Sequence, residues 1–447
     1  MNQLIFQGGA SLRLKRELLA SDIETAAILL ATWSRSNSGR WRIMVREVVH
    51  VPREAYKERS GTSIAIRPSF LAGVIKRARV SNLATVQVHT HPWGGDVRPS
   101  HVDLQGEATL LPTLQSRVPG APHGRLIIGQ QGYDAALYPP NARVAEAMRI
   151  VDVGRDILSP MTAASPEASA PERFDRQVRA FGLEGQDRVS RYRVGIVGLG
   201  GTGSVVNQEL AYLGVRDFLL IDNDVVEQSN LNRIVGAGGG DVGRAKVDVA
   251  RETILAVDPR AVVEVLKGDV LRTDVARTLL DVDIFFCCTD SHGSRAVLNQ
   301  LAYQHMLPGF DMGARIDVQE GRVTQITGRV QMLAPGLSCL VCSDLLDPEA
   351  VRRDLMSEAQ RRADPYIVGG VEPQPSVISI NSTVGSLAVT MFLSAVTGIP
   401  LSSRSQILRL EKGVVRSVES VAAPSCVVCS PAGAFGRGDA WTEPGKP

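Results

Sequence analysis

The fold is decided by the stretch Val194-Gly195-Ile196-Val197-Gly198-Leu199-Gly200-Gly201-Thr202-Gly203, an apolar run followed by a glycine-rich turn. The apolar run predicts a buried strand over 193–197, and the residues after the glycines predict a helix over about 203–213. Glycines allow a backbone to approach a phosphate, and the N-terminus of the next helix favours its negative charge. The stretch therefore predicts a Rossmann-like α/β domain that binds a nucleotide through Gly198, Gly200, Gly201 and Gly203.

A turn of this kind is also typical of NAD-binding domains. Asp222 ends the next predicted strand, 217–222, where a carboxylate can bind a ribose hydroxyl. A helix near 243–256 and strands over 261–266 and 282–288 continue the α/β pattern. Polar residues follow that a dinucleotide site would not need: Asp224, Ser229-Asn230-Leu231-Asn232-Arg233, Lys246 and Thr289-Asp290.

These polar residues suit the chemistry of ATP. Arg233 and Lys246 can neutralise phosphates, Asn230 can donate a hydrogen bond to a phosphate oxygen, and Asp290 can hold Mg²⁺. Each residue alone would be a solvated surface group, but their joint spacing favours a site. We therefore expect a domain that uses ATP.

The ordered series resembles the adenylation domains of the ThiF/MoeB and ubiquitin-activating enzyme family, over residues 172–415. Arg173-Phe174-Asp175-Arg176-Gln177 matches the opening of that family, and Gly185-Gln186 matches the pair shortly after it. The resemblance implies ATP-dependent adenylation of a ubiquitin-like protein that ends in Gly, with a conjugating-enzyme-like acceptor. It also implies a homodimer in which Arg176 reaches the ATP of the opposite subunit.

Four of the six cysteines form two C-x-x-C pairs, Cys339 with Cys342 and Cys426 with Cys429. Four thiolates make a closed tetrahedral zinc site, which is structural because no position remains for water. The resemblance implies a zinc staple in the same places. A redox role for one pair stays open.

Ubiquitin-activating enzymes also capture the acyl group on a cysteine that follows a mobile crossover segment, here the charged stretch 343–365. The matching region, 366–372, contains no cysteine, and Gly370 or a neighbour stands in its place. Cys287 and Cys288 lie in an apolar predicted strand, where core packing is favoured over nucleophilic catalysis. We therefore expect the adenylate to pass to an acceptor without an enzyme thioester.

The first 154 residues contain a second chemical pattern. Strands are predicted over 26–30 and 41–45, a helix over 68–79, and a strand over 85–88 that runs into His89-Thr90-His91-Pro92. His89 and His91 point the same way off the strand, and Asp103 of Ser100-His101-Val102-Asp103 can supply a third ligand. Two histidines and a carboxylate form an open zinc site, whose bound water has a pKa near about 7.

This pattern resembles the JAMM (JAB/MPN) zinc metalloprotease family over residues 10–145. The resemblance implies that His89, His91 and Asp103 bind zinc, that Glu24 is the general acid/base, and that Ser100 stabilises the oxyanion. Eight residues separate His91 from Ser100, one more than the family pattern has. Members of this type cleave the bond after the terminal Gly of ubiquitin-like proteins.

The domain boundaries follow from composition. Residues 155–171 are rich in Ala, Ser and Pro and predict a linker between a JAMM domain over 1–154 and a ThiF-type domain over 172–430. Residues 431–447 are rich in Gly and Pro and predict a flexible tail. The predicted fold class is therefore α/β, with an α/β metalloprotease domain followed by a Rossmann-like adenylation domain.

The overall charge is almost balanced, with 49 basic and 47 acidic residues. It gives no reason to expect a nucleic-acid or membrane partner. No signal-peptide pattern follows Met1, and no apolar run approaches the roughly 20 residues that span a bilayer. We therefore expect a cytoplasmic protein.

Together these patterns predict a bifunctional enzyme that adenylates a ubiquitin-like protein and that also trims or removes it. Activation of a ThiS- or MoaD-like sulfur carrier for cofactor biosynthesis is the alternative. A non-catalytic scaffold that binds a ubiquitin-like protein is a third reading, against which both sets of polar residues argue. A role in antiphage defence would suit such a fusion.

Overall fold

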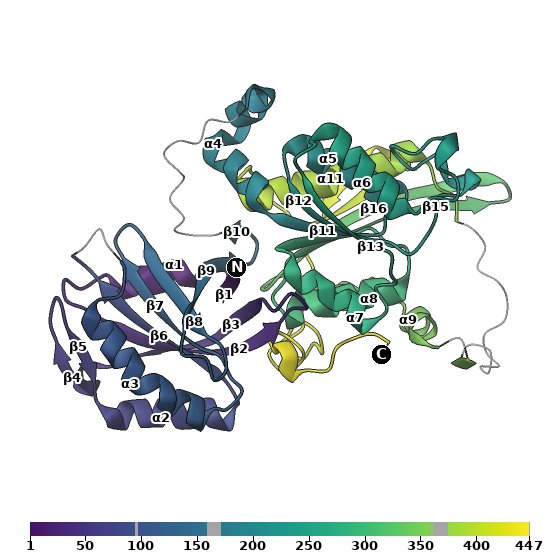
Figure 1. Ribbon diagram of the computed structural model, residues 1–447. Helices are drawn as coiled ribbons and strands as arrows, with labels where there is room; N and C mark the ends of the chain where they lie inside the picture. Colours follow the sequence, from purple (N-terminus) through teal and green to yellow (C-terminus); the bar gives the residue numbers. More distant parts are fainter. Residues whose placement is uncertain (94–96, 159–170, 358, 361–373, 447) are drawn as a thin grey trace. The chain divides into compact units, whose positions relative to one another are not determined.

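The computed structural model describes residues 1–446 except 94–96, 159–170, 358 and 361–373 (Figure 1). The chain forms two compact units. Unit 1 is Met1–Pro166 with Gly436–Thr442, and unit 2 is Glu167–Phe435 with Glu443–Pro447. Most of the predicted linker, 155–171, falls outside the described residues.

Unit 1 is built on one eight-stranded sheet with the order β1-β3-β2-β6-β7-β8-β9-β10. Its strands are β1 (Asn2–Gln7), β2 (Ala26–Arg35), β3 (Trp41–His50), β6 (Ala84–His91), β7 (His123–Gly129), β8 (Tyr133–Tyr138), β9 (Glu146–Val153) and β10 (Ile157–Leu158). Because β1 pairs with both β3 and β9, the pairings from β1 to β9 form a closed ring.

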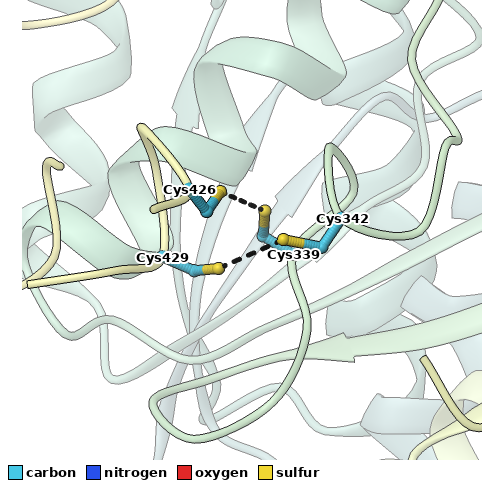
Figure 2. Close-up of side chains that lie close together, drawn as sticks. All are labelled: Cys339, Cys342, Cys426 and Cys429. Atoms are coloured by element: carbon cyan, nitrogen blue, oxygen red, sulfur yellow. Dashed lines mark hydrogen bonds between the residues drawn. The ribbon is translucent and has the colours of Figure 1, made fainter. Parts of the chain in front are cut away.

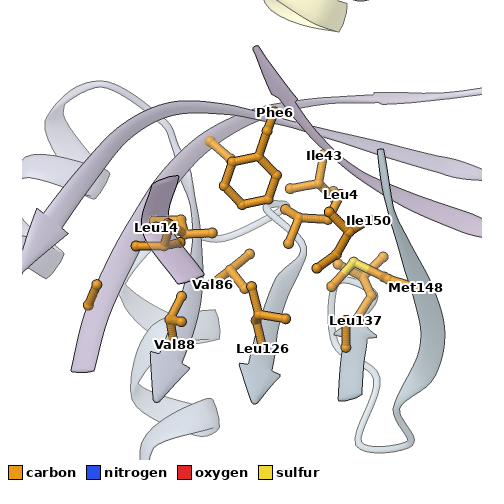
Figure 3. Packing of buried hydrophobic residues seen from close by; sticks show 14 of the residues in the cluster. Leu4, Phe6, Leu14, Ile43, Val86, Val88, Leu126, Leu137, Met148 and Ile150 are labelled. Atoms are coloured by element: carbon orange, nitrogen blue, oxygen red, sulfur yellow. The ribbon is translucent and has the colours of Figure 1, made fainter. Parts of the chain in front are cut away.

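Two layers of apolar side chains lie on opposite faces of this curved sheet. Ala27, Leu29 and Ala31 of β2 point into the main core, which also holds Phe6 and Leu14 (Figure 3). The alternate β2 residues Ile28 and Leu30 pack instead with Val74 and Ala78 of α2 (Pro68–Val80). Period-two alternation in one buried strand thus builds both layers.

Unit 1 also contains short helices and a hairpin outside the sheet. They are α1 (Ala10–Leu18), the 3-10 helix η1 (Arg53–Ala55), the β4–β5 hairpin (Tyr56–Arg59 and Ile64–Ile66) and α3 (His101–Arg117). Ala26 pairs with His89, so the start of β2 lies beside the histidine end of β6. This register brings Glu24 and the two histidines to one place.

Part of the predicted tail belongs to unit 1. Thr32 Oγ1 donates to the carbonyl of Gly436 at 2.5 Å, and the Arg35 N–H donates to Asp439 Oδ2 at 3.0 Å. Gly438, in the 3-10 helix η7 (Gly438–Ala440), is buried with φ +53°, and a Cβ there would lie 2.2 Å from the Trp33 carbonyl oxygen. The prediction of a flexible tail over 431–447 is wrong for residues 436–442, because backbone and side-chain groups of β2 and the Met44 side chain of β3 contact them.

Unit 2 contains a second eight-stranded sheet, in the order β13-β12-β11-β14-β15-β16-β17-β18. Its strands are β11 (Arg193–Val197), β12 (Asp217–Ile221), β13 (Val262–Leu266), β14 (Ile284–Cys287), β15 (Gly309–Gln319), β16 (Arg322–Leu333), β17 (Ser405–Arg409) and β18 (Val414–Ser417). Pairing is parallel from β13 to β15 and antiparallel from β15 to β18. The parallel half confirms the predicted Rossmann-like α/β fold.

Helices pack around this sheet. They are α4 (Asp175–Arg191), α5 (Gly201–Leu213), α6 (Lys246–Val257), α7 (Thr273–Ala276), α8 (His292–Gln304), α9 (Pro348–Leu355) and α11 (Ile378–Thr397). Short 3-10 helices are η2 (Glu172–Phe174), η3 (Gln228–Asn230), η4 (Gly239–Asp241), η5 (Arg277–Asp281) and η6 (Leu410–Lys412). The helix predicted near 243–256 begins at Lys246, so this lysine stands at a helix N-terminus.

Helix α11 is long and apolar enough to cross a membrane by length and composition alone. The prediction that no apolar run approaches this length is therefore wrong. In the structure α11 packs against α5, β15 and β16, and Val384, Ala388 and Phe392 are fully or almost fully buried. Burial of this face inside unit 2 accounts for its apolar composition.

We expect Gly438→Ala to destabilise unit 1 by more than about 2 kcal/mol, because the new methyl group clashes with a backbone carbonyl as well as straining φ. All four tryptophans, Trp33, Trp41, Trp93 and Trp441, lie in unit 1, so tryptophan fluorescence during urea unfolding reports on this unit. Gly8→Ala is the matched control, since Gly8 has φ +52° but nothing within 4 Å of its Cβ position. Equal losses of stability in both variants would show that the close contact between Gly438 and the Trp33 carbonyl does not contribute to the stability of unit 1.

The buried His123 makes the stability of unit 1 depend on pH. Its Nδ1 accepts a hydrogen bond from the Thr85 hydroxyl at 2.9 Å, and burial lowers the pKa of the imidazole to about 4. Between about pH 6.5 and pH 4 the unfolded chain binds a proton that the folded chain does not. The free energy of unfolding therefore decreases as the pH is lowered through this window, by about 3 kcal/mol in total. We expect His123→Asn, which keeps an acceptor near Nδ1, to flatten that part of the fluorescence-monitored stability curve. An unchanged slope would assign the acid sensitivity to other groups.

Candidate functional sites

The turn between β11 and α5 has room only for glycine at two positions. Gly198 has φ +87°, and a Cβ there would lie 2.9 Å from the Cys288 carbonyl oxygen. A Cβ on Gly203 would lie 1.9 Å from the Gly198 carbonyl oxygen, whereas nothing lies within 4 Å of the Cβ position of Gly200. Backbone carbonyls therefore close the turn at Gly198 and Gly203, whereas the space beside Gly200 is open. The N-terminus of α5 at this place favours a phosphate.

Asp222, which directly follows β12, is hydrogen-bonded to this turn. Its carboxylate accepts hydrogen bonds from the backbone N–H of Leu199 at 2.6 Å and of Asp224 at 2.8 Å. Burial raises the pKa of the Asp222 carboxyl, although these hydrogen bonds oppose the shift. Each oxygen keeps a second lone pair, so the predicted bond to a ribose hydroxyl is compatible with this structural role.

Two basic residues flank the turn. Arg233 Nη1 donates to the Ser229 carbonyl at 2.6 Å, and its Cδ lies 3.6 Å from the Cβ position of Gly201. Lys246 Nζ lies 2.7 Å from Asp224 Oδ2. Arg233 thus lies beside the glycine turn, and Lys246 is paired with a carboxylate.

Three further residues were predicted to contribute to the nucleotide site. Asn230 is buried, accepts from the Glu227 N–H at 3.4 Å and donates to Ser229 Oγ at 3.2 Å, which stabilises the segment that carries Arg233. Asp290 follows β14 and Arg176 lies on α4; both are exposed, and neither forms an ion pair within the part of the chain that the structure describes. Their roles stay predictions.

The four cysteines of the C-x-x-C pairs meet at one place in unit 2 (Figure 2). Cys339 Sγ lies 3.6 Å from Cys426 Sγ, and Cys342 Sγ lies 3.5 Å from Cys429 Sγ. These separations exceed a disulfide bond of about 2.05 Å and are close to the ~3.8 Å expected between sulfurs around a tetrahedral zinc ion. The donor set therefore fits structural zinc.

The two histidines and the aspartate predicted as zinc ligands also meet, in unit 1. His89 Nε2 lies 3.2 Å from His91 Nε2 and 3.2 Å from Asp103 Oδ1, and His91 Nε2 lies 3.4 Å from Asp103 Oδ2. Zinc bonds of about 2.0 Å at tetrahedral angles require ligand separations near 3.3 Å. The three side chains have the spacing of one face of a zinc coordination tetrahedron.

Glu24 and Ser100 lie next to these ligands. Glu24 is buried just before β2, and burial raises the pKa of its carboxyl, while the charges of His89 and His91 oppose the rise. Ser100 Oγ accepts from the Asp103 N–H at 3.2 Å, and Asp103 Oδ2 accepts from the Ser100 N–H at 2.7 Å. Burial would raise the pKa of Asp103, but hydrogen bonds with the histidines lower it overall.

Comparison with known families decides the class of unit 2. Residues 174–427, more than half of the chain, match the model of the ThiF family. The chain belongs to the ThiF family. The matched residues include the glycine turn, the basic residues beside it and three of the four zinc-type cysteines.

Several curated ThiF relatives are similar to part of the chain. The SAMP-activating enzyme E1 of Haloferax volcanii is 30% identical over 188 residues, which are 42% of this chain and 65% of that protein. The molybdopterin-synthase adenylyltransferase of Escherichia coli is 33% identical over 157 residues, 35% of this chain and 62% of that protein. The ubiquitin-like modifier-activating enzyme 5 of Oryza sativa is 24% identical over 257 residues, 53% and 59% respectively. The chain thus spans less than two thirds of each relative.

Solved structures are similar to this chain at a lower level. E. coli MccB with ATP shares 20% identity at a TM-score of 0.47, over 59% of this chain and 76% of MccB. PaaA shares 23% identity at a TM-score of 0.44, over 59% of this chain and 87% of PaaA.

The cysteines outside the zinc-type cluster are poorly placed for nucleophilic catalysis. Cys287 is fully buried in β14, and burial raises its pKa well above the usual range. Burial also raises the pKa of Cys288, whose sulfur lies 3.8 Å from Met312 Sδ. The region 366–372, where the family resemblance would put a catalytic cysteine, lies outside the described residues.

Sequence reasoning missed two contributions to these sites. Asn381 of α11 lies against Gly201 although almost two hundred residues separate them in the chain, and no local pattern marks it. Ser100 and Asp103 form a capping box at the start of α3. The S-x-x-D spacing before a helix is the known signal for such a box, and it could have been recognised.

We expect the purified chain to contain about two zinc ions, because two donor sets have zinc-like geometry. His89→Ala should remove one of them, and a chelator should remove the same one first, since four thiolates hold the other in a closed site. Inductively coupled plasma mass spectrometry of wild type and variant measures both. A wild type without zinc, or a zinc content unchanged by His89→Ala, would exclude a metal site at the histidines.

Proposed function

We propose that the chain is a bifunctional enzyme of a ubiquitin-like conjugation pathway. Unit 2 adenylates the C-terminal Gly of a ubiquitin-like protein, and unit 1 matures that protein or removes it from conjugates. The main support is the arrangement of Asp222 and Arg233 around a glycine turn in a ThiF-family domain. The names of the three curated relatives, two activating enzymes and an adenylyltransferase, agree with it.

In the proposed adenylation, a carboxylate oxygen of the terminal Gly attacks the α-phosphorus of ATP. The bond to the β-phosphate oxygen breaks, and pyrophosphate leaves with its electron pair. The turn and α5 would hold the phosphates, and Asp222 the ribose. Arg233 and Lys246 would stabilise the charge that develops, after Lys246 exchanges Asp224 for a phosphate. Exposed Asp290 would hold Mg²⁺, which screens the phosphate charges.

Unit 1 would hydrolyse the bond after the terminal Gly as a JAMM-type zinc isopeptidase. Zinc held by His89, His91 and Asp103 would lower the pKa of a water ligand toward about 7. Glu24 lies where it can accept a proton from the attacking water and pass it to the leaving amine. The Ser100 hydroxyl accepts from the Asp103 N–H, so its own hydrogen is available to the carbonyl oxygen of the scissile bond.

The proposal extends to partners. Exposed Arg176 on α4 would reach the ATP of a second subunit, which makes the enzyme a homodimer. The adenylate would pass directly to a conjugating-enzyme-like acceptor, because Cys287 is buried and Cys288, which is only partly exposed, has a raised pKa. We place the enzyme in the cytoplasm, in a pathway such as antiphage defence. The alternative is activation of a ThiS- or MoaD-like sulfur carrier, which the molybdopterin-synthase relative favours.

The test is pyrophosphate–ATP exchange by the full chain with ubiquitin-like and sulfur-carrier proteins of the same organism, each ending in an exposed Gly. We expect exchange with one of them, and we expect Asp290→Ala to lower it by about 100-fold or more, because Mg²⁺ is lost beside the reacting phosphate. Cleavage of a C-terminal extension from the same protein should be unaffected by this substitution.

Glu24→Gln is the reciprocal variant. It should abolish cleavage and leave exchange unchanged, because Glu24 lies in unit 1. Loss of both activities in either variant would show that the residue supports folding rather than one reaction. Exchange only with a sulfur carrier would favour the alternative pathway.

A further inference from the structure

Gly201, the first residue of α5, is enclosed by side chains from two distant parts of unit 2. A Cβ on Gly201 would lie 2.2 Å from Asn381 Nδ2 and 3.6 Å from Arg233 Cδ. Asn381 belongs to the first two turns of α11 and is only 5% exposed. Its amide therefore lies directly on the glycine turn, close to the position that a Gly201 side chain would take.

The same amide group holds the chain that leads into α11. Asn381 Nδ2 donates a hydrogen bond to Ser376 Oγ at 2.9 Å. Ser376 is half-buried and precedes the first residue of the helix, Ile378. One nitrogen with two hydrogens thus touches the nucleotide turn and the entry to α11.

The body of α11 is fixed to α5 and cannot absorb a movement of the turn. Gly385 fits against Val205, whose Cγ1 lies 3.2 Å from the Gly385 Cβ position. Ser386 Oγ donates to Glu209 Oε1 at 2.5 Å. These contacts hold α11 against α5, and the Asn381 side chain links Gly201 directly to Ser376.

We propose that Asn381 is a positioning residue that couples ATP binding at the glycine turn to the placement of the chain at Ser376 and Val377. This inference rests on the nucleotide site of the proposed function and adds a route of regulation to it. Phosphate at the N-terminus of α5 fixes the turn and the Asn381 amide beside it, and the fixed amide holds Ser376. Coupling of this kind is reciprocal, so an ordered segment before α11 also tightens ATP binding.

The test is hydrogen–deuterium exchange of the full chain with and without MgATP, followed in peptides that cover residues 374–380. Wild type should show at least about fivefold slower exchange there when ATP is saturating. Asn381→Ala and Ser376→Ala should each lose most of this protection, while the Kd for ATP rises less than about threefold. Asn381→Leu should behave as Asn381→Ala, because it keeps the approximate volume of the side chain but has no group that donates or accepts a hydrogen bond.

Ser382→Ala is the matched control. Ser382 follows Asn381 in the same turn, and its hydroxyl forms no hydrogen bond within the part of the chain that the structure describes. It should retain the protection of wild type.

Three results would overturn the proposal. One is a wild type without protection at 374–380. Another is full protection in Asn381→Ala or Asn381→Leu. The third is a more than tenfold loss of ATP affinity in Asn381→Ala with protection restored at saturating ATP, which would make Asn381 a phosphate ligand only. A wild type that binds ATP and shows the protection, yet exchanges no pyrophosphate with any carrier, would contradict the proposed function and leave the coupling intact.

Discussion

The close approach of the backbone to itself between β11 and α5 is the constraint on which unit 2 depends. The Gly203 Cα lies against the Gly198 carbonyl, and Gly198 lies against the carbonyl at the end of β14, so no side chain fits between them. This contact fixes the first turn of α5 over the carboxyl ends of two parallel strands. Asp222, Arg233 and Asn381 reach the same turn from three other parts of unit 2. Their arrangement depends on the turn because its backbone conformation is fixed.

Local signals explain why so much of this unit could be predicted from the sequence. An apolar run and a set of glycines lie within ten residues, and the predicted strand over 193–197 agrees with β11 residue for residue. The Asn381 contact and the Lys246–Asp224 pair could not be predicted in this way. Both depend on where a later helix or a neighbouring loop packs, and a single Asn in an apolar helix has no distinctive spacing.

The histidine site shows how one pattern can serve two purposes. Ser100 and Asp103 cap the N-terminus of α3, and Asp103 also faces both histidines. The cap fixes the backbone of the aspartate, so a preformed carboxylate position costs little further ordering. The same pattern therefore predicts a helix start and a metal ligand, and neither excludes the other.

The tail was mispredicted because its composition, rich in Gly and Pro, suggested flexibility. In the structure Gly438 is packed so closely against the Trp33 carbonyl that no Cβ fits there.

The two candidate sites obtain their charge balance by different means. In unit 2, Lys246 is paired with Asp224, an exposed carboxylate that a bound polyanion would have to displace. In unit 1, one carboxylate faces two imidazoles, and Glu24 stays buried beside them. A cation among these four groups would bind the lone pairs of two imidazole nitrogens that lie 3.2 Å apart. We therefore expect a metal ion at the carboxylates and imidazoles of unit 1, and a polyanion beside Arg233 and Lys246 in unit 2.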